Sequence, residues 1–131
     1  PDKIKTTNGL TGMATIDYVQ RKLEEKRRLT IPAELRSELK SGVVVTRGFK
    51  NYLHLYPKSV WDKQVEPKLK GDILSEEVAD LNVQFRMGKL ESPLDVKQGR
   101  IVLEQHLLDY AGIKKEVACV RAGSYWRIVA V

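Results

Sequence analysis

The chain has 131 residues, of which 42% are hydrophobic and 31% charged, a balance typical of a folded globular protein and a length too short for two independent domains. Its net charge of +6 favours an anionic partner, although a basic surface kept for solubility would give the same total. No apolar run approaches the roughly 20 residues that span a bilayer, so we expect a cytoplasmic protein without a membrane partner.

Residues 1–12 are polar and without periodicity, and we expect an extension or an expression remnant ahead of a natural start at Met13. From Ala14 onward, apolar and polar residues alternate and predict a short strand, which ends in charged residues after Val19. The charged stretch 18–28, taken alone, fits a helix as well as a loop.

Proline is tolerated at a first helical position, so Pro32 predicts a short helix that ends near Gly42. The apolar stretches 43–46 and 52–56, separated by a turn that contains a glycine, predict a β-hairpin.

Two helical segments are predicted between residues 58 and 90. The first is interrupted by Pro67. The second begins at Ser75, a residue type favoured at the N-cap, with two glutamates in the first turn. A spacing of four, three and four residues predicts one apolar face, formed by Leu74, Val78, Leu81 and Phe85.

Beyond Pro93 the predicted elements repeat the order of the first half: a basic turn, a short apolar strand, a helix and two more strands. Matched positions lie 72 to 74 residues apart: Arg28 with Arg100, Leu35 with Leu107, and Arg47 with Arg121. We interpret this as an internal duplication. Because Pro93 and Gly99 resist a helix before Arg100, the matching stretch 24–28 is predicted to be a turn between strands.

Each half, roughly 45 residues, is too small to bury a core alone. We therefore expect the halves to interleave into one barrel with approximate two-fold symmetry. The predicted organisation is a first repeat at 13–57, a helical connector at 58–90 and a second repeat at 91–131.

Three stretches, KRRLTIPAELRSEL, VVVTRGFKNYLHLYP and DVKQGRIVLEQHLLDYAGIKKEV, resemble the MraZ family of bacterial regulators, and with the middle helix they span most of residues 13–131. The resemblance implies an α+β, mainly β fold: a double swapped-hairpin (AbrB-like) barrel of two tandem repeats with connecting helices. It also implies a transcription factor that binds repeated DNA elements upstream of the cell division and cell wall genes. A ring-shaped homo-oligomer is the implied assembly.

In the family, each repeat carries an Asp-x-x-x-Arg turn whose arginine side faces DNA. Here the first turn, residues 24–28, has glutamate in place of aspartate and Arg27 in place of the usual glycine. The second turn, residues 96–100, has Val96 at the acid position, which cannot accept hydrogen bonds, although Asp95 is adjacent.

The candidate DNA-binding residues lie in these two basic stretches. Arginine offers a planar donor fork that engages guanine or a phosphate with two hydrogen bonds, although a solvated charged turn would have the same composition. The acid of the first turn either holds Arg28 through a charge-assisted hydrogen bond or offsets local repulsion. The candidates are Lys22, Glu24, Lys26, Arg27 and Arg28 in the first stretch, and Lys97 and Arg100 in the second.

No catalytic constellation is visible in the sequence. His54 and His106 lack the spaced carboxylate or cysteine partners of a metal site or a triad, and no glycine turn has the strand-to-helix context of a phosphate loop. We therefore expect no enzyme activity, metal, cofactor or small-molecule substrate. The single cysteine, Cys119, excludes an intramolecular disulfide, and its apolar setting predicts a buried strand position.

The expected partners are double-stranded DNA at the nucleoid and further copies of the chain. Apolar positions in the closing segment 125–131 are expected to form the edge by which subunits join. The alternative is an oligomeric assembly or antitoxin-like partner-binding module with weakened DNA recognition.

Overall fold

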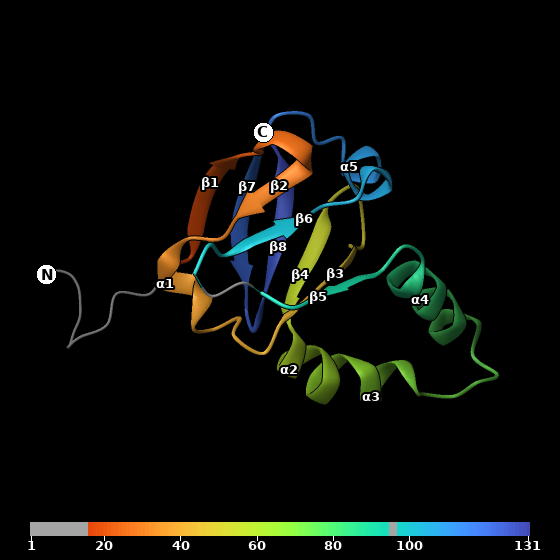
Figure 1. Ribbon diagram of the computed structural model, residues 1–131. Coiled ribbons are helices and arrows are strands. Elements are labelled where there is room, and N and C mark those ends of the chain that lie inside the picture. The colour runs from red at the N-terminus through yellow and green to blue at the C-terminus, as the bar shows by residue number, and fades with distance from the viewer. Residues whose placement is uncertain (1–15, 95–96) are drawn as a thin grey trace, which may run out of the picture.

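A computed structural model describes residues 16–94 and 97–131, and most of its elements are strands (Figure 1). The strands are β1 (Tyr18–Lys22), β2 (Arg28–Thr30), β3 (Val43–Arg47), β4 (Leu53–Pro57), β5 (Leu90–Ser92), β6 (Arg100–Val102), β7 (Glu116–Ala122) and β8 (Tyr125–Ala130). The helices are α1 (Ala33–Arg36), α2 (Lys58–Val60), α3 (Glu66–Leu69), α4 (Glu76–Arg86) and α5 (Gln105–Ala111), with a 3-10 turn η1 (Glu25–Arg27) and a π-helical segment η2 (Trp61–Val65). The predicted mixed class, mainly β, is confirmed.

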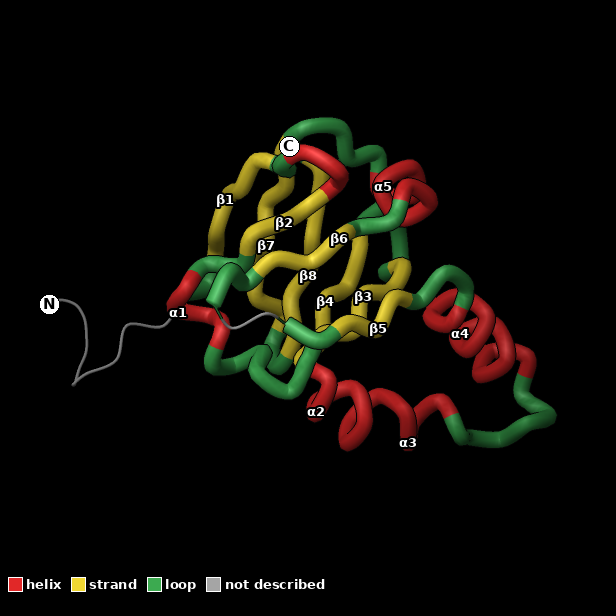
Figure 2. The backbone as a smooth tube through the Cα atoms, viewed as in Figure 1, coloured by secondary structure: helices red, strands yellow, loops and turns green. Residues whose placement is uncertain are grey.

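The strands form two antiparallel sheets (Figure 2). One has six strands in the order β1-β7-β8-β4-β3-β5, and the other is a two-stranded ribbon of β2 and β6. Within the described residues, β1 and β5 are the outer strands and no pairing joins them. The expected swapped-hairpin barrel is therefore not confirmed as a closed barrel, since the described strands form an open sheet with the ribbon crossing one face.

The strand order is symmetric between the first half of the chain, which carries β1–β4, and the second half, which carries β5–β8. Exchanging β1 with β5, β3 with β7 and β4 with β8 gives the same sheet order. The β2–β6 ladder is centred on Leu29 opposite Ile101, and the β4–β8 ladder on His54 opposite Arg127. These two pairs mark an approximate two-fold axis through the molecule.

The local sequence signals explain most element boundaries. The predicted hairpin is formed by β3 and β4, and the predicted N-cap of α4 is confirmed because Ser75 Oγ accepts from Val78 N at 3.3 Å. Helix α5 ends at Gly112, whose φ of 65° suits glycine. Helix α1 is shorter than predicted, since the chain after Arg36 continues as turns toward Gly42.

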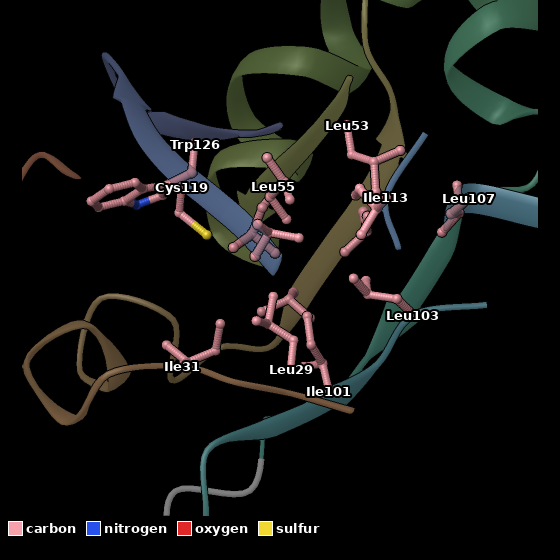
Figure 3. Packing of buried hydrophobic residues seen from close by; sticks show 14 of the residues in the cluster. Leu29, Ile31, Leu53, Leu55, Ile101, Leu103, Leu107, Ile113, Cys119 and Trp126 are labelled. Atoms are coloured by element: carbon pink, nitrogen blue, oxygen red, sulfur yellow. The ribbon is translucent and has the colours of Figure 1, made fainter. Parts of the chain in front are cut away.

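The main core lies between the six-stranded sheet and the ribbon. In Figure 3, side chains from the ribbon strands point toward side chains from the sheet. The fully or nearly fully buried contributors include Leu29 and Ile101 from the ribbon and Leu55, Trp126 and Ile128 from the sheet. Cys119 is buried here as predicted, and burial raises the pKa of its thiol to about 11.

A second apolar cluster packs the connecting helices against the other face of the sheet, where they contact β3 and β4. It contains Val44, Tyr56, Trp61, Leu69 and Phe85. The predicted single apolar face of α4 is only partly buried, because Leu74 is 89% exposed and Leu81 is 40% exposed. No helix among the described residues is both long and apolar enough to cross a bilayer.

The closing strand β8 lies inside the sheet, between β7 and β4. Trp126 is fully buried, and its Nε1 donates to Glu38 Oε2 at 3.2 Å. The expectation that segment 125–131 forms the subunit edge is therefore wrong, since both neighbouring positions of this strand are already occupied within the chain.

Candidate nucleic-acid interface

The first basic stretch forms an exposed turn between β1 and β2, as the sequence predicted. Glu24 N donates to Arg28 O at 2.8 Å and closes the turn. Lys26 and Arg27 both have a φ of 60°, a left-handed conformation that costs a residue with a Cβ atom about 1–2 kcal/mol. The turn therefore presents its cations to solvent at some cost in backbone strain.

Arg27 is tied to the other half of the chain. Its carbonyl oxygen accepts from Leu103 N at 2.9 Å, and its Nε donates to Leu103 O at 3.1 Å. The equivalent bond in the second turn runs from Ile31 N to Gly99 O at 2.7 Å, and Gly99 has a φ of 62°. Arg27 thus occupies a backbone position that suits glycine.

Two arginines that were predicted to bind DNA lie together on the outward face of the ribbon. Because Leu29 is buried, the alternation of side chains along a strand turns its neighbours away from the core. Arg28 lies opposite Val102, and Arg100 lies opposite Thr30. The two arginines are therefore diagonal neighbours on one face, about 7–8 Å apart along the diagonal by ladder geometry and somewhat less between Cβ atoms.

The carboxylate of Glu24 contacts this face across the two halves. Its Oε2 accepts from Thr30 Oγ1 at 2.6 Å, and its Oε1 lies 4.0 Å from Arg100 Nη1. Arg28 instead donates from Nε to Glu25 O at 3.1 Å. Of the two interpretations left open for Glu24, the one in which it holds Arg28 is wrong, because the carboxylate faces the arginine of the second turn.

The remaining candidates lie around the two turns. Lys22 is exposed beside the first turn, and Lys26 is exposed within it. The carbonyl oxygen of Lys97 accepts from Arg36 Nη1 at 3.0 Å, so α1 supports the second turn. The acid position of that turn, Val96, and its neighbour Asp95 lie outside the described residues.

Two further groups of cations were missed by sequence reasoning. Arg36 packs under the second turn so closely that a Cβ atom on Gly99 would lie 2.1 Å from its Nε. Lys114 and Lys115 lie beside the first turn, because Leu23 N donates to Lys115 O at 2.8 Å. The sequence shows the paired lysines, but it does not show that they lie beside the first turn.

The two histidines lie in different environments, one buried and one exposed. His54 is fully buried and shares a hydrogen bond of 2.8 Å between its Nδ1 and the Tyr56 hydroxyl. Burial, followed by the nearby Arg127 charge, lowers the pKa of His54 to about 4. His106 is exposed and lies 3.1 Å from Glu104 Oε1.

The family described as "MraZ protein, putative antitoxin-like" matches residues 17–79. Proteins named transcriptional regulator MraZ are similar over most of the chain. The protein from Kineococcus radiotolerans is 33% identical over 103 residues, which cover 79% of this chain and 71% of the relative. The protein from Roseiflexus sp. is 34% identical over 108 residues, covering 82% and 75%. The protein from Syntrophomonas wolfei is 38% identical over 106 residues, covering 80% and 73%.

Proposed function

Because the chain belongs to the MraZ family, we propose that it is a DNA-binding transcriptional regulator that contacts repeated operator elements through its two basic turns. The observation that carries this proposal is the diagonal placement of Arg28 and Arg100 on one outward face of the ribbon. Two guanidinium groups at this separation can engage neighbouring groups of one duplex. The protein would act in the cytoplasm, at the nucleoid.

The residues divide into contacting and positioning roles. Arg28 and Arg100 contact the duplex, with Lys22, Lys26, Arg27 and Lys97 supplying charge to the phosphate backbone. Glu24 positions Arg100 through the carboxylate that Thr30 also holds. The cations attract DNA of any sequence, whereas the aimed arginine pair discriminates between base sequences.

We further propose that several copies assemble into a ring of double swapped-hairpin units, so that several turns engage several DNA repeats at once. Support comes from apolar surface on β1 and β7, at the far end of the sheet from strand β3, which α4 contacts. Tyr18 and Val120 lie opposite each other there and are 56% and 37% exposed. On α4, Val83 is 58% exposed and could cover such a face in a head-to-tail contact.

Substituting both ribbon arginines tests the proposed function. We expect Arg28→Ala/Arg100→Ala to bind a DNA fragment with the repeated elements at least a hundredfold more weakly, as measured by fluorescence anisotropy, because two charge-assisted contacts are lost. Light scattering should give the same mass for both proteins, since the ribbon face is distant from the proposed contact. DNA affinity unchanged by the double substitution would overturn the proposal and favour the partner-binding alternative.

A test of the assembly changes one residue of the exposed apolar pair Tyr18 and Val120. We expect Val120→Glu to lower the mass measured by light scattering, because a charge would have to be buried in the subunit contact. Val131→Glu is the matched control, since Val131 is also exposed but lies beside Glu116, at the opposite end of β7 from Val120. Oligomers of equal mass for wild type and Val120→Glu would contradict a contact at this face.

A further inference from the structure

A basic hollow of about 640 Å³ lies between the first turn and the loop that follows α5. Both halves of the chain contribute to it. Its charged lining consists of Lys22, Glu24 and Arg27 from the first half and Asp109, Lys114 and Lys115 from the second. Four cations therefore face two carboxylates around one hollow.

The backbone holds the two lysines of the second half in place. Leu23 N donates to Lys115 O at 2.8 Å, and Lys22 lies opposite Glu116 in the β1–β7 ladder. At the other end of the loop, Ile113 N donates to Leu108 O at 2.9 Å. Because both ends of this short loop are fixed, the lysine pair stays beside the first turn.

The two carboxylates are already engaged by neutral or basic partners. Glu24 accepts from Thr30 and faces Arg100, and Asp109 Oδ1 accepts from Gln105 Nε2 at 2.9 Å. The one described hydrogen bond of the Arg27 side chain uses Nε, so within the described residues its two Nη groups have no hydrogen-bond partner. The hollow thus has cationic donors that a multivalent anion could satisfy together.

The symmetry-related edge of the sheet, at β3 and β5, has a hollow with a different charge. The smaller hollow there is lined by Lys58 and Glu91 together with the loop 41–43. Lys58 Nζ lies 2.6 Å from Asp62 Oδ1 and 3.5 Å from Glu91 Oε1. Its cation is therefore already neutralised, and among the described residues the hollow at this edge lacks the excess of cations found at the first.

We propose that the basic hollow binds one phosphate group of the DNA backbone, and that Lys114 and Lys115 are contact residues. This inference rests on the proposed DNA-binding function and extends the interface beyond the two turns. A phosphate next to the bases read by the ribbon would enter the hollow beside Arg27. The first turn would then bind the DNA backbone more strongly than the second turn. This difference would orient the subunit on its operator element.

Substitution of the lysine pair tests the inference. Lys114→Gln/Lys115→Gln removes two charges from the hollow, and Lys63→Gln/Lys70→Gln removes two charges from exposed positions of the connector. Affinity for operator DNA is measured by anisotropy over a series of salt concentrations. We expect the hollow variant to bind about tenfold more weakly, with the slope of log K against log salt reduced by about 0.9, the value for one phosphate. The connector variant should keep the wild-type slope.

The other outcomes show whether the phosphate site, the DNA-binding function or both are wrong. If the wild type binds DNA and the hollow variant matches the connector variant, the phosphate site is overturned while the DNA-binding function stands. If the wild type does not bind DNA, both claims fall. Inorganic phosphate titrated onto the DNA-free protein in a calorimeter is the third arm. Saturable binding that the hollow variant loses, with unchanged DNA affinity, would assign the hollow to a free phosphate compound and overturn the DNA contact.

Discussion

Leu29 lies directly opposite Ile101 at the centre of the β2–β6 ladder, although the two residues stand 72 positions apart in the chain. Both side chains are buried in the main core. Since neighbours along a strand face opposite sides, this one apolar pair fixes the outward direction of both Arg28 and Arg100. The hydrophobic core therefore determines where the cationic surface is, and the surface cannot shift without repacking the core.

The left-handed backbone of the first turn should make glycine more stable than alanine at position 26. We expect Lys26→Gly to be more stable than Lys26→Ala by about 1 kcal/mol, because only glycine adopts a φ of 60° without the cost of a Cβ atom. Both variants lose the same charge, so the pair isolates the backbone effect. Urea denaturation measures the difference. Equal unfolding free energies would contradict a strained turn at this position.

Local signals in the sequence were enough to predict the hairpin and the N-cap of α4. Each depends on neighbouring residues: two apolar stretches on either side of a glycine turn, and the Ser75 hydroxyl near Val78 N. The turn at 24–28 was predicted only through its match with the stretch before Arg100, because its own residues fit a helix as well as a loop. Contacts between the halves could not be predicted in the same way. Glu24 faces Arg100, which is 76 positions away, and only the pairing of β2 with β6 brings them together.

The position of the closing strand was mispredicted for a related reason. A run of apolar residues indicates a strand but does not give its place in the sheet. The apolar side chain of Trp126 was consistent with a subunit contact as well as with a core. Its pairing opposite Leu55 and its bond to Glu38 place it inside the molecule.

The contact between Glu24 and Arg100 predicts an effect on specificity. We expect Glu24→Gln to bind non-specific DNA more tightly, because a negative charge is removed from the interface, and to bind operator DNA less tightly, because Arg100 loses its orienting carboxylate. The ratio of the two affinities should fall by about tenfold. Anisotropy with operator and scrambled duplexes at one salt concentration measures it. A ratio equal to that of the wild type would show that the carboxylate does not orient the arginine.

A half-buried carboxylate joins the two halves on the side of α1. Glu38 accepts from Arg121 Nη1 at 3.2 Å and Nη2 at 3.0 Å, and also from Trp126 Nε1. This contact raises the pKa of Arg121. We expect Glu38→Ala to lower the unfolding free energy by about 1–3 kcal/mol, because a buried indole N–H loses its partner.

The matched control for Glu38 is Glu34→Ala, four residues earlier in helix α1. Glu34 is exposed and has no described side-chain contact, so its substitution should change stability by less than about 0.5 kcal/mol. Chemical denaturation followed by tryptophan fluorescence compares the two variants. A loss of stability no greater for Glu38→Ala than for Glu34→Ala would mean that the contact with Arg121 and Trp126 contributes nothing to the fold.

The buried histidine on the two-fold axis predicts a pH dependence of stability. His54 is neutral in the folded protein because its pKa is lowered to about 4, below the ordinary value of 6.5. Between these values the unfolded chain binds more protons than the folded chain, so stability is full above pH 6.5 and is lost as the pH falls toward 4. We expect the wild type to lose about 2 kcal/mol more than His54→Gln between pH 7 and pH 5. Urea denaturation at both pH values measures the two losses, and equal losses would contradict a buried neutral histidine.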